Sequence, residues 1–137
     1  MGARMRYQDW PERLHKIVTE SHAKPFAWGQ HDCCLFAANV VMELTGIDPA
    51  AELRGAYFSS IAAAKILKDR GGVREIASAV LHEIHPMTAQ RGDVVMIQTE
   101  KHGDTLAVCL GSYCVAPGIE RLEYRPMAGA VAAWRVV

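Results

Sequence analysis

Residues 25–36 read Pro-Phe-Ala-Trp-Gly-Gln-His-Asp-Cys-Cys-Leu-Phe, a loop with aromatic residues and a glycine that leads into an apolar run. Asp32 is predicted to cap a helix that begins at the next residue, which places Cys33 in the first helical turn. The unpaired N–H groups and the positive dipole end there favour a thiolate, the reactive form of a cysteine nucleophile. The alternative is that Cys33 only begins the buried helix face, because free cysteine commonly packs as a small apolar side chain.

Helical patterns surround this stretch in the first part of the chain. Apolar residues after Asp32 fall on one stripe, and Gly46 stands where a left-handed residue ends a helix. Pro11 lies in the first turn of an earlier amphipathic pattern, where its missing N–H costs nothing. Apolar spacing and capping residues together predict four helices, over residues 9–20, 33–45, 59 or 60 to 70, and about 73–82.

After residue 85 the pattern changes to short β-rich runs separated by Gly, Pro and charged residues. The expected strands begin near residues 94, 106, 112, 119 and 131. Helices followed by strands predict an α+β fold in which N-terminal helices pack on a C-terminal antiparallel β-sheet, in a single domain over residues 1–137.

A type II′ turn at Gly111-Ser112 would place Cys109 directly opposite Cys114, and we expect both thiols to stay reduced.

Composition and charge narrow the function classes. Fifteen Lys and Arg residues balance fifteen Asp and Glu residues, so no excess positive charge exists to neutralise phosphates, and nucleic acid is not an expected partner. The longest apolar run, residues 35–42, is too short for membrane insertion, and the first ten residues lack the apolar segment of a secretory signal. The four cysteines lack the spacing of a zinc site, so we expect no metal and no cofactor.

Residues 26–41 resemble the nucleophile motif of the NlpC-type cysteine peptidases of bacterial cell walls, in which an aromatic-x-Trp-Gly loop leads to Asp-Cys at a helix start. Residues 91–96 resemble the Gly-Asp-hydrophobic strand of that family, and residues 106–111 resemble its next strand, which ends in Gly. The resemblance implies a small papain-like fold in which the helix that carries Cys33 packs on an antiparallel sheet.

The chain is also similar, over roughly residues 25–137, to a compact group of phage proteins encoded among tail genes. These proteins share the Trp-Gly-x-x-Asp-Cys motif, a central Asp-Pro-Ala-x-x-Leu-Arg-Gly block as at residues 48–55, and a terminal Ala-Trp-Arg-Val as at residues 133–136. This similarity implies a place in the virion, at the tail tip, with assembly in the bacterial cytoplasm.

The NlpC resemblance assigns roles to residues of this chain. It implies that Cys33 is the nucleophile and that Trp28, Gly29 and Asp32 belong to the substrate-binding loop. The family also carries a histidine six residues before the Gly that ends its second strand. Counting back six residues from Gly111 gives a threonine.

That threonine, Thr105, cannot act as a base near neutral pH, so the expected Cys-His pair is missing at its usual place. His102 lies three residues upstream in a predicted turn, and an odd offset reverses the side-chain face of a strand. His102 is therefore the remaining catalytic candidate only if the chain bends there, and its alternative is an exposed turn residue. His31 could stack beside Cys33, and the other histidines are expected on the surface.

Two functions from different classes follow from these observations. The first is a structural or assembly protein of a phage tail tip, with a degenerate cysteine-peptidase site and a surface that binds tail hub and tip proteins. The second is an active cysteine hydrolase that acts on peptidoglycan peptides through Cys33. The missing histidine favours the first function, because nucleophile and base act as a unit. An apolar contact surface involving some of Trp10, Tyr57 and Phe58 is expected in either case.

Overall fold

The helix that begins at Cys33 is the central element of the fold. In the computed structural model, which describes residues 5–137, helix α2 spans Cys33–Thr45. Asp32 accepts a hydrogen bond from the backbone N–H of Leu35 at 2.9 Å, which caps the helix start. Gly46, with φ of 80°, ends the helix in the left-handed conformation. Both predicted ends of this helix are confirmed.

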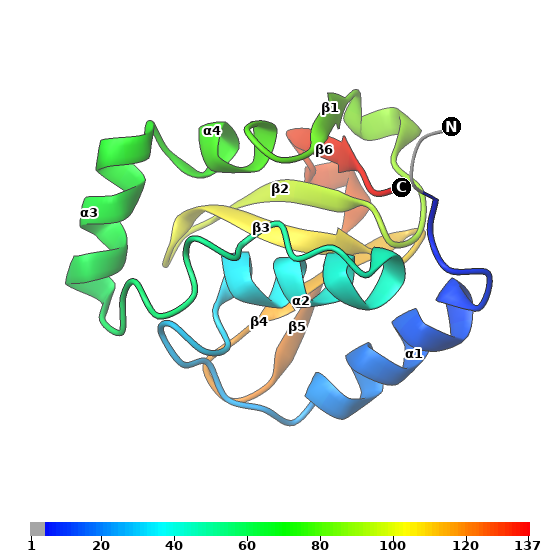
Figure 1. Ribbon diagram of the computed structural model, residues 1–137, viewed down its shortest axis with the longest axis horizontal. Helices are drawn as coiled ribbons and strands as arrows, with labels where there is room; N and C mark the ends of the chain where they lie inside the picture. The colour runs from blue at the N-terminus through cyan, green and yellow to red at the C-terminus, as the bar shows by residue number, and fades with distance from the viewer. Residues whose placement is uncertain (1–4) are drawn as a thin grey trace.

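The other helices lie around α2 as Figure 1 shows. Helix α1 covers Trp10–Ser21, α3 covers Ser60–Arg70 and α4 covers Val73–Ser78, and short 3-10 turns lie at Pro86–Thr88 (η1) and Met127–Gly129 (η2). The prediction of a fourth helix through residue 82 is wrong at its C-terminal end. His82 instead begins strand β1, His82–Ile84, and pairs with Arg135. Pairing with a distant strand outweighs the local helical pattern there.

One sheet contains all six strands. They are β1, β2 (Val94–Thr99), β3 (Gly103–Cys109), β4 (Tyr113–Pro117), β5 (Leu122–Pro126) and β6 (Ala132–Arg135). The order in the sheet is β1-β6-β2-β3-β4-β5, and every neighbouring pair is antiparallel. Strands β2 to β5 form the predicted meander, while β6 returns to lie between β1 and β2. The expected α+β architecture is confirmed.

The hairpin between β3 and β4 has the predicted register. Cys109 lies opposite Cys114, and the backbone N–H of Leu110 donates to the carbonyl oxygen of Tyr113 at 2.7 Å. Gly111 has φ of 112°, a conformation that favours glycine at this turn. Both cysteine side chains are fully buried on the sheet face that lies away from α2.

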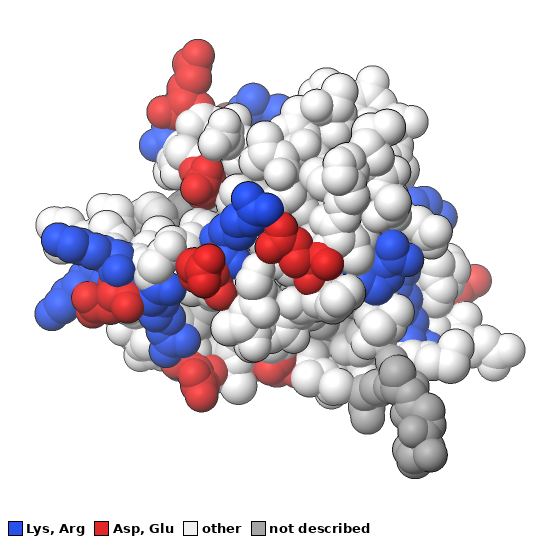
Figure 2. All heavy atoms as spheres, turned by 90° about the horizontal axis from the view of Figure 1, so that it is seen from above, with Lys and Arg blue, Asp and Glu red and all other residues white. Residues whose placement is uncertain are grey.

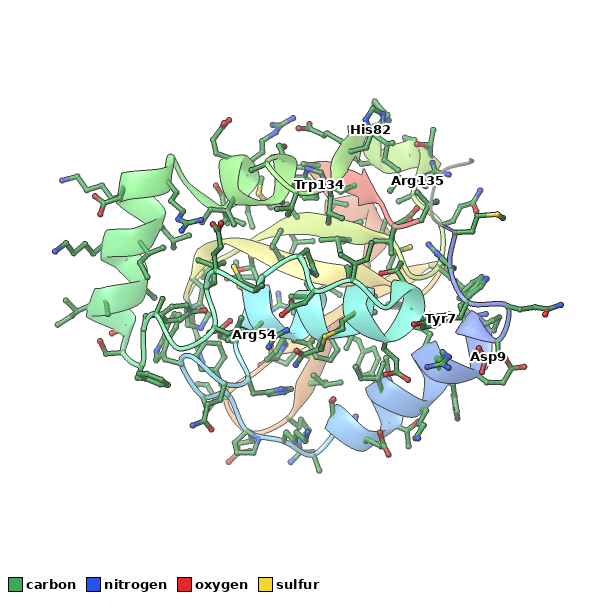
Figure 3. All side chains as sticks on the ribbon, in the orientation of Figure 1. Tyr7, Asp9, Arg54, His82, Trp134 and Arg135 are labelled. Atoms are coloured by element: carbon green, nitrogen blue, oxygen red, sulfur yellow. The ribbon has the colours of Figure 1, made fainter. Side chains whose placement is uncertain are left out.

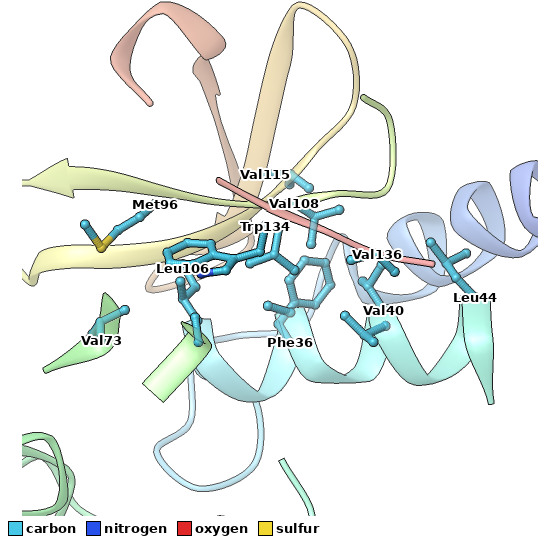
Figure 4. Close-up of a cluster of buried hydrophobic side chains, with 14 of the residues drawn as sticks. Phe36, Val40, Leu44, Val73, Met96, Leu106, Val108, Val115, Trp134 and Val136 are labelled. Atoms are coloured by element: carbon cyan, nitrogen blue, oxygen red, sulfur yellow. The ribbon is translucent and has the colours of Figure 1, made fainter. Parts of the chain in front are cut away.

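The main core lies between α2 and the sheet, as Figure 4 shows. Phe36, Val40 and Leu44 point from α2 toward the sheet. Trp134 of β6 is fully buried against them, and its indole N–H donates to the Ser78 hydroxyl at 3.0 Å, so the largest core side chain has no unsatisfied donor. Helix α1 packs beside α2 (Figure 1) and adds the fully buried Leu14 to the same core. Within residues 5–137, no helix is long and apolar enough to cross a membrane.

The residues predicted to form a contact surface differ in exposure. Phe58 is 64% exposed, whereas Tyr57 is only 6% exposed. The Trp10 ring is partly covered by the guanidinium of Arg6, which lies 4.5 Å from the ring centre. Arg6 is itself held by the fully buried carboxylate of Asp93 at 2.9 Å. Of this set, Phe58 is exposed, Trp10 is partly exposed and Tyr57 is buried.

Candidate functional site

A narrow apolar cleft lies where the N-terminus of α2 meets α3, α4 and strand β3. It encloses about 90 Å³. Four of the sequence-predicted site residues line it, namely Trp28, Asp32, Cys33 and His102, and so does Thr105. The remaining lining residues are mainly apolar and are Phe26, Cys34, Leu53, Tyr57, Ala63, Ile66, Leu67, Val73, Ile76, Asp104 and Pro117.

Asp32 organises the loop that leads to the cleft. Its carboxylate is buried and accepts three hydrogen bonds, from the backbone N–H of Leu35 at 2.9 Å, that of Gly29 at 2.9 Å and the Tyr57 hydroxyl at 2.6 Å. These donors stabilise the negative charge inside the protein. Because both oxygens are already engaged, Asp32 holds the loop and the start of α2 in place rather than offering a free carboxylate to a substrate.

The segment after α2 supplies Tyr57, which sequence reasoning did not place in the site. Arg54 fixes this segment by donating to Asp48 at 2.7 Å and to Asn39 of α2 at 2.7 Å. Figure 3 shows Arg54 beside α2. The block at residues 48–55 was the available signal, since a charged pair within it could tie the following segment to the helix. Burial and the neighbouring Asp32 carboxylate raise the pKa of Tyr57, so its hydroxyl stays a donor.

Gly29 is required where the two segments meet. Its φ of 79° favours glycine, and a Cβ atom there would lie 2.1 Å from the Tyr57 carbonyl oxygen. The loop can therefore approach Tyr57 only without a side chain at this position, and Gly29 itself, unlike Trp28 and Asp32, does not line the cleft. Trp28, the preceding residue, is partly exposed and lines the cleft.

Cys33 lies partly exposed in the first turn of α2, as predicted, and its side chain is near the backbone of Leu106 on strand β3. A hydrogen bond from the Cys34 side chain is the main cause that lowers the pKa of Cys33, and the backbone of Leu106 contributes in the same direction. Burial and the Asp32 carboxylate oppose this effect. The pKa of Cys34 is raised well above its ordinary value, first by its hydrogen bond to Cys33 and then by burial. Of the two thiols, Cys33 therefore ionises first.

His102 lines the same cleft from the turn between β2 and β3. Its ring stacks on Phe26 with 5.4 Å between centroids and 4° between planes, and meets Trp28 edge-on at 6.0 Å. These three rings form one wall of the cleft. Within residues 5–137, the hydrogen bonds and charges that set the pKa of Cys33 come from Cys34, Leu106 and Asp32, and none comes from a histidine. His102 thus shares the cleft with Cys33, and its ring contacts are with Phe26 and Trp28.

Thr105 lies on β3, where the NlpC resemblance would place the histidine. It is 5% exposed and lines the cleft, and its hydroxyl donates to the Gly103 carbonyl oxygen at 3.2 Å. A threonine hydroxyl is a weak acid and not a base near neutral pH. The cleft thus combines a cysteine at a helix N-terminus with a buried threonine at the position of the missing base.

The comparison with protein-family models gives one match, which covers residues 5–136 and is described as a domain of unknown function, DUF6950. The chain belongs to this family. No curated protein sequence matches the chain.

Solved structures show which fold this DUF6950 chain adopts. The NlpC/p60 domain of the peptidoglycan hydrolase SagA superposes with a TM-score of 0.57 and 15% sequence identity, over 90% of this chain and 97% of that chain. RipD from Mycobacterium tuberculosis, described as a non-catalytic NlpC/p60 domain protein adapted to peptidoglycan binding, gives a TM-score of 0.49 and 16% identity over 96% of this chain and 100% of that chain. The similarity to the SagA domain confirms the predicted NlpC-type fold.

The histidines of the DUF6950 chain other than His102 lie outside the cleft. His31 is 8% exposed and packs edge-on against Phe36 at 5.7 Å, so it does not stack beside Cys33. His85 accepts a hydrogen bond from the backbone N–H of Met87 at 3.1 Å, away from the site. Within residues 5–137, no group of three or more His, Cys, Asp or Glu side chains is arranged to hold a metal ion.

Proposed function

We propose that this domain is a non-catalytic NlpC/p60-type module that serves as a structural or assembly component of a phage tail tip. The observation that carries the proposal is the environment of Cys33. The groups that lower the pKa of Cys33 are the Cys34 thiol and the Leu106 backbone, and Thr105 lies where the NlpC resemblance would place the catalytic histidine. A cysteine peptidase needs an imidazole in contact with its nucleophile, and loss of either member removes most of the rate.

The size of the cleft also favours binding over hydrolysis. A volume of about 90 Å³ is well below the 300 Å³ or more of common ligand pockets. It has room for a single side chain. We therefore propose that the cleft receives one apolar side chain from a partner, held by the aromatic wall of Phe26, Trp28 and His102.

The proposed partners are tail hub and tip proteins. The similarity to proteins encoded among phage tail genes supports this choice, as it supports a location in the virion after assembly in the bacterial cytoplasm. Figure 2 shows Lys and Arg side chains interspersed with Asp and Glu on the face seen from above, between broad uncharged areas. A surface of this kind suits protein contacts better than the phosphates of nucleic acid.

A second candidate is an active hydrolase of peptidoglycan peptides. It is favoured by two observations, namely that His102 and Cys33 line the same cleft and that the pKa of Cys33 is lowered. In this mechanism His102 would leave its stacked position on Phe26 and accept the proton of Cys33. The loss of one aromatic stack, about 1 kcal/mol, would be the cost of that movement.

The two candidates are separated by incubating purified protein with peptidoglycan fragments and analysing the peptides by mass spectrometry. The proposal expects no cleavage by the wild-type protein above that of Cys33→Ala, and the same result for His102→Ala. Cleavage that disappears in both variants would establish the hydrolase.

For the assembly role, the test is co-purification with tail hub and tip proteins of the phage that encodes the chain. A stable complex is expected, and tails that assemble and infect normally without this protein would contradict the role.

A further inference from the structure

Cys33 and Cys34 are neighbours in space as well as in sequence. Both residues are partly exposed and both line the same cleft, and the Cys34 side chain is the main influence that lowers the pKa of Cys33. Successive side chains on a helix usually diverge. Here both side chains of the first turn of α2 nevertheless line the same cleft, and both residues are partly exposed, so one small molecule in the cleft can meet both thiols.

Among residues 5–137, no further His, Cys, Asp or Glu side chain is placed to form a metal site of three or more ligands with the two thiols. Asp32, the nearest carboxylate in sequence, already accepts hydrogen bonds from Gly29, Leu35 and Tyr57. Within the described residues no set of three or more metal-binding side chains occurs. A tetrahedral zinc ion, which needs four ligands, is therefore a poor fit. Soft ions that bind two sulfur atoms are a better fit.

We propose that Cys33 and Cys34 form a two-thiol site that binds one soft, thiophilic ion, such as Cu(I) or trivalent arsenic, at the mouth of the apolar cleft. The aromatic and aliphatic wall of the cleft would shield the bound ion from water. Occupation would also place the ion where a partner side chain would enter. The site depends only on the two sulfur atoms, so it is independent of the proposed role in tail assembly.

The second cysteine pair provides a control within the same chain. Cys109 and Cys114 face each other across β3 and β4, yet both are completely buried. A reagent that needs two adjacent thiols would find the same chemistry there but no access. Selective reaction at Cys33 and Cys34 would thus show that access through the cleft, and not merely the presence of two nearby cysteines, determines binding.

Phenylarsine oxide is a suitable probe, because it reacts with two thiols without changing oxidation state. Two sulfur–arsenic bonds form, the arsenic–oxygen bond breaks, and the two thiol protons leave with the oxygen as one water molecule. The reduced wild-type protein, at its native fold, should take up one equivalent, measured as a single adduct by intact-mass spectrometry. Excess 2,3-dimercaptopropanol should remove the adduct, whereas the same thiol concentration as 2-mercaptoethanol should leave it bound.

Variants assign the adduct to its residues. Cys33→Ser and Cys34→Ser should each weaken binding about 100-fold or more, because the second bond is intramolecular and benefits from a high effective concentration. The double variant Cys109→Ser/Cys114→Ser should bind like the wild type. Circular dichroism of each variant checks that its fold is retained. The proposal is overturned if the wild type forms no adduct, if either single variant binds as tightly, or if the double variant loses binding.

Discussion

The two cysteine pairs of this chain show how differently the same residue behaves in two regions of one fold. Cys33 and Cys34 adjoin in sequence, line an accessible cleft and have pKa values moved in opposite directions. Cys109 and Cys114 are brought together by strand pairing and are fully buried. Burial raises the pKa of both, that of Cys114 to about 11.

The difference has a physical origin in hydrogen bonding. In the cleft, a thiol and a backbone group stabilise the Cys33 thiolate and offset the cost of burial. In the hairpin, Cys109 has a contact from the Gly111 N–H at 3.4 Å, but burial outweighs it. Reactive chemistry therefore belongs at the start of α2, and the hairpin cysteines act as small core residues.

The largest expected contrast is in alkylation by iodoacetamide at pH 7. Cys109 and Cys114 react only when the hairpin opens, so they should react at least about 1000-fold more slowly than Cys33, as an opening free energy of about 4 kcal/mol implies. Peptide mapping of the modified cysteines against time measures both rates. Comparable rates in the folded protein would show that the hairpin is not a closed core.

The variant Cys34→Ala sharpens this comparison. It removes the main hydrogen bond that lowers the pKa of Cys33, so the alkylation of Cys33 should shift to higher pH. Cys34→Ser keeps a donor and should shift the profile less. An unchanged profile in Cys34→Ala would mean that the helix start alone controls the thiol.

Asp32→Ala should cause the next largest effect, a loss of about 3 to 5 kcal/mol in the free energy of unfolding. The change removes the cap of α2 and leaves the buried donors of Gly29 and Tyr57 without an acceptor. Urea denaturation followed by circular dichroism measures this loss. Asp9→Ala is the matched control, because Asp9 precedes α1 without a side-chain cap and is exposed. Equal losses in the two variants would contradict the anchoring role of Asp32.

The ease of prediction from sequence also differs between local and distant contacts. Asp32 and Gly46 define α2 through their immediate neighbours, and the Gly111 turn defines the Cys109 register, so these features could be predicted. The end of α4 could not, because His82 pairs with Arg135, a residue 53 positions away. Figure 3 shows His82 and Arg135 together at the same side of the molecule.

In the candidate site too, the features set by local sequence could be predicted, and the contacts between distant segments could not. The position of Cys33 followed from its helix, and the resemblance pointed to Thr105 on the strand. The block at residues 48–55 signals that Arg54 could tie the following segment to α2, but only the fold shows that Tyr57 of that segment contacts Asp32. The wall that His102 forms with Phe26 joins a turn to a loop more than 70 residues earlier, so its geometry required the fold.

The loop before α2 and the β3–β4 hairpin also differ in how much an alanine in place of their glycine should destabilise the fold. Gly29→Ala should cost about 2 to 4 kcal/mol, because positive φ is strained for alanine and the new Cβ would overlap the Tyr57 carbonyl oxygen. Gly111→Ala also places alanine at a positive φ, but the atom nearest to its new Cβ lies 4.0 Å away, so a smaller cost of about 1 to 2 kcal/mol is expected. Thermal denaturation of both variants measures the difference. A larger loss for Gly111→Ala would reverse the proposed order.

The smallest expected effect concerns pH and arises in the loop before α2. Burial lowers the pKa of His31 below its ordinary value of 6.5, with Lys24 acting in the same direction and Asp32 against it. The unfolded chain therefore binds the proton more readily, so stability from this residue is complete above about pH 6.5 and is lost as the pH falls below it.

His31→Gln should reduce that loss, because it keeps a polar side chain that does not titrate. The free energy of unfolding, measured between pH 5 and pH 8, should change less with pH in this variant than in the wild type. His82→Gln is the control for the substitution itself, since His82 is exposed on β1 and lies outside this loop. The Nε2 atom of His31 is buried with no hydrogen-bond partner among residues 5–137, so a proton there would introduce an uncompensated charge. Identical pH profiles for wild type and His31→Gln would show that the loop opens to accept the charge at little cost.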